Sequence, residues 1–275
     1  MKIHILTLFP EMCRAPLQES MMKRAQEKGL LEVNIVYIRD FAEGRHQVTD
    51  DYPFGGGAGL VMKPEPIFRA VDSVLEAPGR GSEKENAKPP RVILMSPQGE
   101  TFTQTKAWEL SKEDELIFLC GHYEGMDERV RTLVTDDISI GDYVLTGGEL
   151  PALVVIDAVV RLIPGVISEE SLVAESFADG VLEGPQYTRP REFRGLTVPE
   201  ILLSGDHGKL RRWRRKEGLR RTLQFRPDLI ERLDLSREDR ELIREIREES
   251  ERQSVDEEEL RAGGEVREEA DHSDR

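Results

Sequence analysis

Residues 140–151 read IGDYVLTGGELP, and this glycine-rich loop follows a short predicted strand, Asp137–Ser139. Two similar loops occur earlier: SPQGE (96–100) follows the apolar run Val92–Met95, and GHYEG (121–125) follows Leu116–Cys120. In open α/β sheets, ligands bind beyond the carboxyl ends of the strands, where glycine lets the backbone approach closely. Ordinary turn chemistry would explain any one of these loops, but three in succession favour a shared pocket.

The segments around these loops alternate between strand and helix patterns up to about residue 165. The predicted strands are Ile3–Phe9, Glu32–Ile38, Val92–Met95, Leu116–Cys120 and Asp137–Ser139, and the predicted helices are Glu11–Lys28, Pro64–Glu76 and Glu149–Leu162. Short continuous apolar runs are typical of strands buried on both faces of a parallel sheet. The alternation predicts an α/β domain with a parallel sheet. The apolar helix Glu149–Leu162 is expected to pack against the sheet or another subunit, and 77–90 to form a polar surface loop.

The predicted pocket lacks the signatures of common nucleotide and metal sites. The chain has no G-x-G-x-x-G after its first strand and no G-x-x-x-x-G-K-[ST], and the three loops are poor in Lys and Arg. They therefore suit a ligand without phosphates. The five histidines show no metal-ligand spacing, and there is no G-x-S-x-G nucleophile motif. A further glycine run, FGGGAG (54–59), either brings backbone close to a flat ligand or is a plain loop.

The charge of the chain is unevenly distributed. The net charge of −15 by itself argues against a nucleic-acid partner. However, residues 247–275 hold 12 acidic and 5 basic residues, a net of −7, whereas Lys209–Arg221 holds eight basic residues and one acid, a net of +7. Apart from Glu217, four residues before Arg221, no acidic partners stand at i±4 to neutralise this basic run, and Trp213 interrupts it. A nucleic-acid surface is therefore favoured over a solvated helix face.

Four segments are predicted. They are an α/β domain (1–165), a flexible linker (166–181), a small helical domain (182–246) and an acidic, disordered tail (247–275). The helical patterns in the second domain are Val198–Leu203, Lys209–Thr222 and Arg226–Leu233, and a frayed helix over Asp239–Glu249 could extend into the tail.

The apolar runs are far shorter than the ~20 residues of a membrane span, and Met1–Met12 lacks signal-peptide features. With only two cysteines, a cytoplasmic protein is the expectation.

Several motifs occur in an order that resembles a known family. They are FPEM (9–12), FGGGAG (54–59), SPQG (96–99), GHYEG (121–125), IGDYVLTGGELP (140–151), SFADG (176–180) and YTRP (187–190). The chain closely resembles the bacterial tRNA (guanine-N1-)-methyltransferases, the TrmD family, over roughly residues 1–233. These enzymes methylate the guanosine at tRNA position 37, 3′ to the anticodon.

The resemblance implies a knotted fold of the SPOUT superfamily, with a deep trefoil near the cofactor, which is an exception to the usual absence of knots. It also implies bound S-adenosylmethionine, tRNA as substrate, a homodimer with the pocket completed at the subunit interface, and a possible Mg²⁺ requirement with no identified metal ligands. The implied cofactor contacts are Met95, Ser96, Pro97, Gly99, Gly121, Tyr123, Glu124, Ile140, Gly141, Asp142, Tyr143, Val144, Leu145, Gly147, Gly148 and Pro151. The expected tRNA contacts are Gly57, Gly59, Tyr187, Arg189, Lys209, Arg211, Arg212, Arg214 and Arg215.

The family's motif positions also imply catalytic residues. Arg161 corresponds to a group that stabilises negative charge on guanine O6, although its place near a helix C-terminus is also typical of a structural cation. The residue before Ser176 is usually Asp and here is Glu175, the expected base, with Glu183 as the second candidate. Asp179 is expected to serve a turn. His122 stands where many members carry Arg, and we assign it no role.

Two other functions remain open at this point. A SPOUT-like methyltransferase could act on another RNA, but the YTRP match and the basic helix argue against it. The same scaffold could also serve a non-catalytic RNA-binding protein, since Glu175 departs from the usual Asp.

Overall fold

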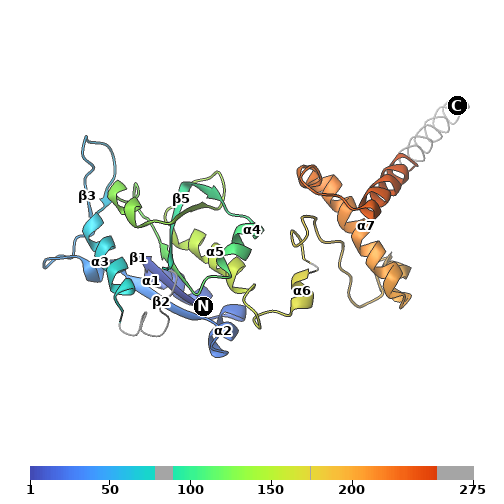
Figure 1. Ribbon diagram of the computed structural model, residues 1–275, viewed down its shortest axis with the longest axis horizontal. Coiled ribbons are helices and arrows are strands. Elements are labelled where there is room, and N and C mark those ends of the chain that lie inside the picture. The colour runs from blue at the N-terminus through green and yellow to red at the C-terminus, as the bar shows by residue number, and fades with distance from the viewer. Residues whose placement is uncertain (78–88, 174, 253–275) are drawn as a thin grey trace, which may run out of the picture. The chain divides into compact units, whose positions relative to one another are not determined.

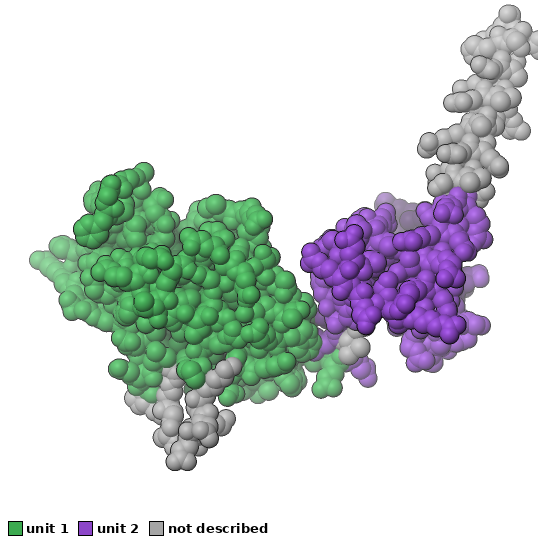
Figure 2. Space-filling view, turned by 45° about the horizontal axis from the view of Figure 1, so that its top comes forward, with its two compact units in different colours: residues 1–169 green, residues 170–275 purple. Residues whose placement is uncertain are grey.

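A computed structural model describes residues 1–77, 89–173 and 175–252, and the chain divides into two compact units (Figures 1 and 2). Unit 1 is Met1–Glu169, and unit 2 is Glu170–Arg275. The division falls within the predicted linker, 166–181. Most of the predicted 77–90 loop and residues 253–275 of the predicted tail lie outside the described residues.

Unit 1 is built on a five-stranded parallel sheet in the order β2-β1-β6-β5-β7, so the α/β prediction is confirmed. Its strands are β1 (Lys2–Thr7), β2 (Glu32–Tyr37), β5 (Arg91–Thr101), β6 (Glu115–Leu119) and β7 (Asp136–Ser139). Two short strands, β3 (Asp50–Asp51) and β4 (Val61–Met62), form a separate antiparallel pair. β5 comes before β6 in the chain but does not pair with β1. β6 lies between β1 and β5 and pairs with both.

Helices cover both faces of the sheet (Figure 1). They are α1 (Pro10–Leu17), α2 (Ser20–Glu27), α3 (Pro64–Leu75), α4 (Gln104–Leu110) and α5 (Glu149–Val160), with short 3-10 helices at Ile38–Phe41 and Glu128–Leu133. Helix α3 packs its buried face against Ile117 and Leu119 of β6. Side chains alternate along a strand, so Leu116 and Phe118 point to the opposite face, where α5 contacts α1, α2 and α4. Because both faces are covered, the apolar residues of β6 are fully buried.

The prediction of one helix over Glu11–Lys28 is wrong, because the segment forms α1 and α2. Pro16 has no backbone N–H to continue the helical hydrogen bonds, and the Gln18 N–H bonds the Ala15 carbonyl in a tighter turn. The chain then turns at Ser20, whose φ of 50° lies in the left-handed region. Because the chain turns here, α2 starts in a new direction, and its side chains Met22 and Ala25 are buried.

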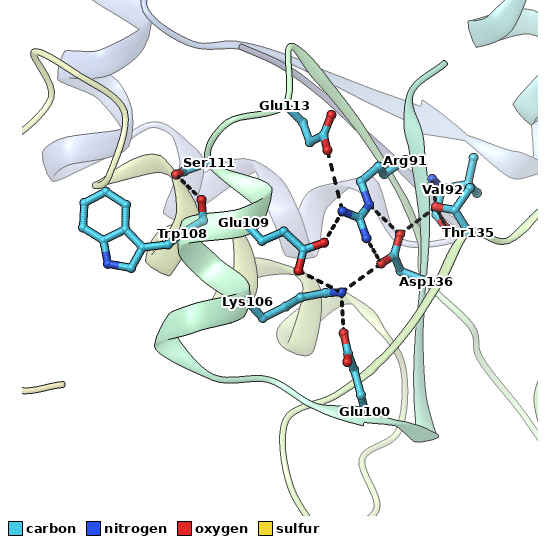
Figure 3. A network of polar contacts seen from close by, with 10 residues as sticks. All are labelled: Arg91, Val92, Glu100, Lys106, Trp108, Glu109, Ser111, Glu113, Thr135 and Asp136. Atoms are coloured by element: carbon cyan, nitrogen blue, oxygen red, sulfur yellow. Dashed lines mark hydrogen bonds and ion pairs between the residues drawn. The ribbon is translucent and has the colours of Figure 1, made fainter. Parts of the chain in front are cut away.

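An ion-pair network ties β5, α4 and β7 together (Figure 3). Arg91 Nε donates to Asp136 Oδ2 over 2.8 Å, and Lys106 Nζ lies 3.1 Å from Asp136 Oδ1. Thr135 Oγ1 also donates to Asp136 Oδ2 over 2.7 Å. Burial of Asp136 would raise the pKa of its carboxyl, but the hydrogen bonds from Arg91, Thr135 and Lys106 outweigh burial and lower that pKa to about 2.

Unit 2 is mainly helical. It contains α6 (Glu169–Val173) at its boundary, a two-stranded pair of β8 (Glu192–Phe193) and β9 (Leu196–Thr197), a 3-10 helix at Glu200–Leu203, α7 (His207–Phe225), α8 (Pro227–Ile230) and a helix over 237–252. Its core joins Val181 and Leu219 to Leu242, Ile243 and Ile246 of the last helix. The first residues of the predicted tail, 247–252, therefore continue a helix that helps to form this core.

Candidate functional site

One cavity is lined by all three predicted loops, at the carboxyl ends of β6 and β7 and where residues 96–99 bulge out of β5. The predicted cofactor residues that line it are Met95, Ser96, Pro97, Gly121, Tyr123, Glu124, Ile140, Gly141, Tyr143, Val144, Leu145, Gly147, Gly148 and Pro151. His122, Gly125, Ile138, Ser139 and Thr146 also line it and were missed. The missed residues lie inside the loops or end the preceding strand, so the same loop pattern could have included them.

Two predicted cofactor residues, Gly99 and Asp142, are not among those that line the cavity. Gly99 has a packing role, since a Cβ atom there would lie 2.4 Å from the backbone of Asp137 and Ile138. Met95 and Glu100 both pair with Ile138, so residues 96–99 bulge out of a strand that continues to Thr101. The first loop therefore interrupts β5, and the prediction that this strand ends at Met95 is wrong.

The second and third loops are held together by close backbone contacts. The Gly148 N–H donates to the Gly121 carbonyl over 2.8 Å, and His122 forms an isolated antiparallel bridge with Gly147. A Cβ atom on Gly148 would lie 2.8 Å from the Cys120 Cα atom, so any side chain there would force the loops apart. Tyr123, which follows, has a φ of 60°. This strained backbone forms part of the cavity wall, as expected of a binding loop.

A buried polar cluster lies directly behind this wall. Glu149 begins α5 and is fully buried, and Thr7 Oγ1 donates to its Oε1 atom over 2.6 Å. Its Oε2 atom lies 3.9 Å from His122 Nδ1, and neither atom has a hydrogen-bond partner. The His122 ring also packs against Phe9, with centroids 4.4 Å apart. Glu149 thus contacts residues at the ends of β1 and β6 and lies beside the cavity loops.

The cavity lining favours a flat, partly apolar ligand without phosphates. Among the described residues that line it there is no Lys or Arg, and Glu124 is the single carboxylate. The Glu124 carboxylate packs against Gly59, where a Cβ atom would lie 2.4 Å from it, and the Glu124 N–H donates to Leu60 O over 3.0 Å. The glycine run 54–59 therefore contacts a residue that lines the cavity.

Neither cysteine is suited to nucleophilic chemistry. Burial, followed by the nearby Glu149 carboxylate, raises the pKa of the Cys13 thiol to about 11. The same two causes raise the pKa of the fully buried Cys120 thiol well above its usual value. Both side chains therefore stay as neutral thiols and fill space between β6, α1 and α5.

The predicted catalytic residues belong to different units. Arg161 is the C-cap of α5 in unit 1 and is half-buried, whereas Glu175 and Glu183 lie in unit 2. The Glu175 carbonyl accepts a bond from Ala178 N–H over 3.2 Å, and the Glu183 N–H donates to Ser176 Oγ over 2.9 Å. This turn holds both carboxylates on one short segment. Asp179 Oδ1 accepts from Val181 N–H within the same segment, in agreement with its predicted turn role.

The basic run forms most of α7, and carboxylates distant in sequence neutralise part of it. Arg212 pairs with Glu245 at 2.6 Å, Arg215 with Asp239 at 2.7 Å, and Lys209 with Asp206 at 3.4 Å. The first two partners lie 24 to 33 residues away, so a search at i±4 could not find them. Of the other predicted tRNA contacts, Tyr187 is 48% exposed, and Arg189 is exposed as well.

Two searches restricted to the described residues were negative. No three His, Cys, Asp or Glu side chains among residues 1–77, 89–173 and 175–252 converge as a metal site would require. In the same ranges, no helix has the length and apolar character needed to cross a bilayer.

Comparison with known proteins gives a consistent result. Residues 1–232 match a family model described as "tRNA (Guanine-1)-methyltransferase TrmD". The chain is 60% identical over 248 residues to a protein of Moorella thermoacetica and 57% identical over 248 residues to one of Pelotomaculum thermopropionicum, covering 90% of this chain and 96% of each relative. It is 56% identical over 245 residues to a Staphylococcus aureus protein, covering 88% and 96%. All three relatives are named tRNA (guanine-N(1)-)-methyltransferase.

Proposed function

The chain belongs to the tRNA (guanine-1)-methyltransferase family, and from this premise we propose that it transfers a methyl group from S-adenosylmethionine to N1 of guanosine 37 of tRNA. The observation that carries the proposal is the match to the family model across residues 1–232. The named relatives are covered over nearly their whole length, so catalytic and substrate-binding regions are both represented.

The cavity suits S-adenosylmethionine chemically. Its glycine and apolar lining accepts a nucleoside without phosphates, and the Glu124 carboxylate complements a positively charged sulfonium. When bound, S-adenosylmethionine supplies a methyl group on sulfur that is open to in-line displacement. We assign cofactor binding to the residues of the three loops that line the cavity, and a packing role to Gly99.

A group of the protein must also accept the proton that guanine N1 carries. We assign the Glu175 carboxylate as the base that accepts this proton, with Glu183 as the alternative. As the proton leaves, negative charge builds on O6, and the Arg161 guanidinium stabilises it by donating hydrogen bonds. N1 would accept the methyl group as the sulfur–methyl bond breaks, with a neutral thioether as the leaving group. No step is assigned to Mg²⁺, because the described residues offer no cluster that would hold it.

We also propose that the protein is a knotted, homodimeric member of the SPOUT superfamily that acts in the cytoplasm, with unit 2 binding tRNA. An apolar face on α1 and α5, which contact each other, supports the dimer: Met12 of α1 is 39% exposed, and Leu150 and Val154 of α5 are 51% and 50% exposed. Apolar side chains that exposed on neighbouring helices are typical of an interface. A partner subunit over this face would cover α5, whose sequence is apolar on most sides.

One assay tests the function. The protein is incubated with methyl-labelled S-adenosylmethionine and two transcripts of one tRNA, carrying either guanosine or adenosine at position 37. We expect label only in the guanosine transcript, and nucleoside analysis should place it on N1. Equal labelling of both transcripts would contradict methylation of guanosine 37. No labelling of any RNA would favour an RNA-binding protein without methyltransferase activity.

A further inference from the structure

The basic residues of α7 divide into two groups by their ion pairs. Lys216 Nζ lies 2.9 Å from Glu245 and 2.7 Å from Glu249, and Arg220 pairs with Glu217 and Glu249. Arg212 and Arg215 pair with carboxylates on the same 237–252 helix. Arg212, Lys216 and Arg220 are four residues apart, and Arg215 stands three residues after Arg212, so all four lie on one side of α7. Their charges are already neutralised within unit 2.

The remaining arginines follow a different side of α7. Arg211, Arg214 and Arg221 are spaced three and seven residues apart, which places them together on one helical face. All three are exposed, and none forms an ion pair with a described carboxylate. Gly218 lies on the same face, where a Cβ atom would be 2.7 Å from the Leu182 carbonyl, so the segment after Val181 runs along it.

That segment and Arg214 line a second cavity, wholly within unit 2. Its rim carries Arg189, Arg191 and Arg214, and Tyr187 contributes an aromatic ring. Its other apolar residues are Val198, Leu202 and Leu203, from the segment before α7. No Asp or Glu is among the described residues that line it, although acids make up 54 of the 275 residues of the chain. In so acidic a protein, three exposed arginines around one apolar hollow are a site for an anion with an apolar part.

A nucleotide of single-stranded RNA has this combination of groups. Guanidinium groups match phosphate oxygens in geometry and charge, and unstacked bases of RNA loops stack on aromatic side chains. We propose that this cavity binds one nucleotide of the RNA substrate, with its phosphates on Arg189, Arg191 and Arg214 and its base against Tyr187 and the apolar residues. The inference rests on the proposed function, since it identifies the RNA as the methylated tRNA.

The test compares an arginine of the cavity with a neutralised arginine on the same helix. Arg214→Gln and Arg191→Gln remove charges from the cavity, whereas Arg220→Gln removes a charge that is already paired, and Glu249 keeps Lys216 as a partner. Binding of unmodified tRNA is measured by fluorescence anisotropy over a series of salt concentrations. Each cavity variant should bind several-fold more weakly and lower the salt slope by about one. Arg220→Gln should leave both quantities near those of the parent protein.

Variants of Tyr187 test the contribution of base stacking to tRNA binding separately from that of charge. Tyr187→Ala should weaken binding by about tenfold, as for loss of one stacked base, without changing the salt slope, and Tyr187→Phe should restore it. Equal effects of Arg214→Gln and Arg220→Gln would overturn the proposal, because only net charge would then matter, and so would unchanged binding by all cavity variants. Methylation is read in parallel: a parent protein that binds tRNA through this cavity but transfers no methyl group would overturn the proposed function alone.

Discussion

The Oε2 atom of Glu149 faces Nδ1 of His122 at 3.9 Å, and both atoms are buried without a hydrogen-bond partner. A Cβ atom on Gly147 would lie 2.4 Å from the first atom and 2.5 Å from the second, so glycine at this position lets the pair meet across the loop. Because Glu149 also accepts from Thr7, it links the ends of two strands behind the proposed cofactor cavity. We expect Glu149 to position the cavity loops without contacting the cofactor.

This role predicts different outcomes for two substitutions of Glu149. Glu149→Leu leaves the buried hydroxyl of Thr7 without an acceptor, which costs about 1–3 kcal/mol, and it should weaken S-adenosylmethionine binding by loosening the loops. Glu149→Gln keeps the acceptor and can donate to His122 Nδ1, so its stability should equal or exceed that of the parent. Thermal denaturation and calorimetric titration measure both quantities. Equal loss of stability in the two variants would show that the hydrogen bonds to Glu149 are unimportant.

The close approach of the second and third loops predicts the effect of Gly148→Ala. Gly148 has a φ of −85°, which any residue adopts, so strain would come from the close contacts of the added Cβ with the Cys120 Cα atom at 2.8 Å and the Gly121 N atom at 2.9 Å. Separating the loops should weaken S-adenosylmethionine binding by about tenfold or more, equivalent to about 1.4 kcal/mol. Gly208→Ala in unit 2 is a matched control, since its Cβ would meet only the Asp206 side chain at 3.4 Å. Similar cofactor affinity in the two variants would contradict this account.

The cavity was predictable because its signal is local. Each loop contains glycine and follows a short predicted strand, and parallel strands bring such loops to one edge of the sheet. The placement of β6 between β1 and β5 was not predictable, because strand order depends on pairing between distant segments. Likewise, the pairing of Arg212 with Glu245 spans 33 residues and is invisible to a search of neighbouring helix positions.

The Arg91–Asp136 pair predicts a pH-dependent contribution to stability. The pKa of Asp136 is lowered to about 2 from its ordinary value of 3.8, so its ionised form stabilises the folded state above about pH 4 and this stability is lost as pH falls toward 2. The shift corresponds to about 2 kcal/mol. Asp136→Asn should therefore unfold more easily than the parent in urea near neutral pH, with a difference that shrinks as pH falls. A difference that is constant with pH would mean that ionisation of Asp136 is not its source.

The proposed base predicts a separation of binding from turnover. Glu175→Gln keeps the size of the side chain but cannot accept the N1 proton, so single-turnover methylation should fall by about 10²–10⁴-fold, while S-adenosylmethionine and tRNA affinities stay near those of the parent. Glu175→Asp restores the carboxylate on a chain one methylene shorter and should recover most of the rate. Glu183→Gln is the matched comparison on the same segment. If Glu175→Gln stays active and Glu183→Gln does not, the base is Glu183; if both stay active, neither carboxylate removes the proton.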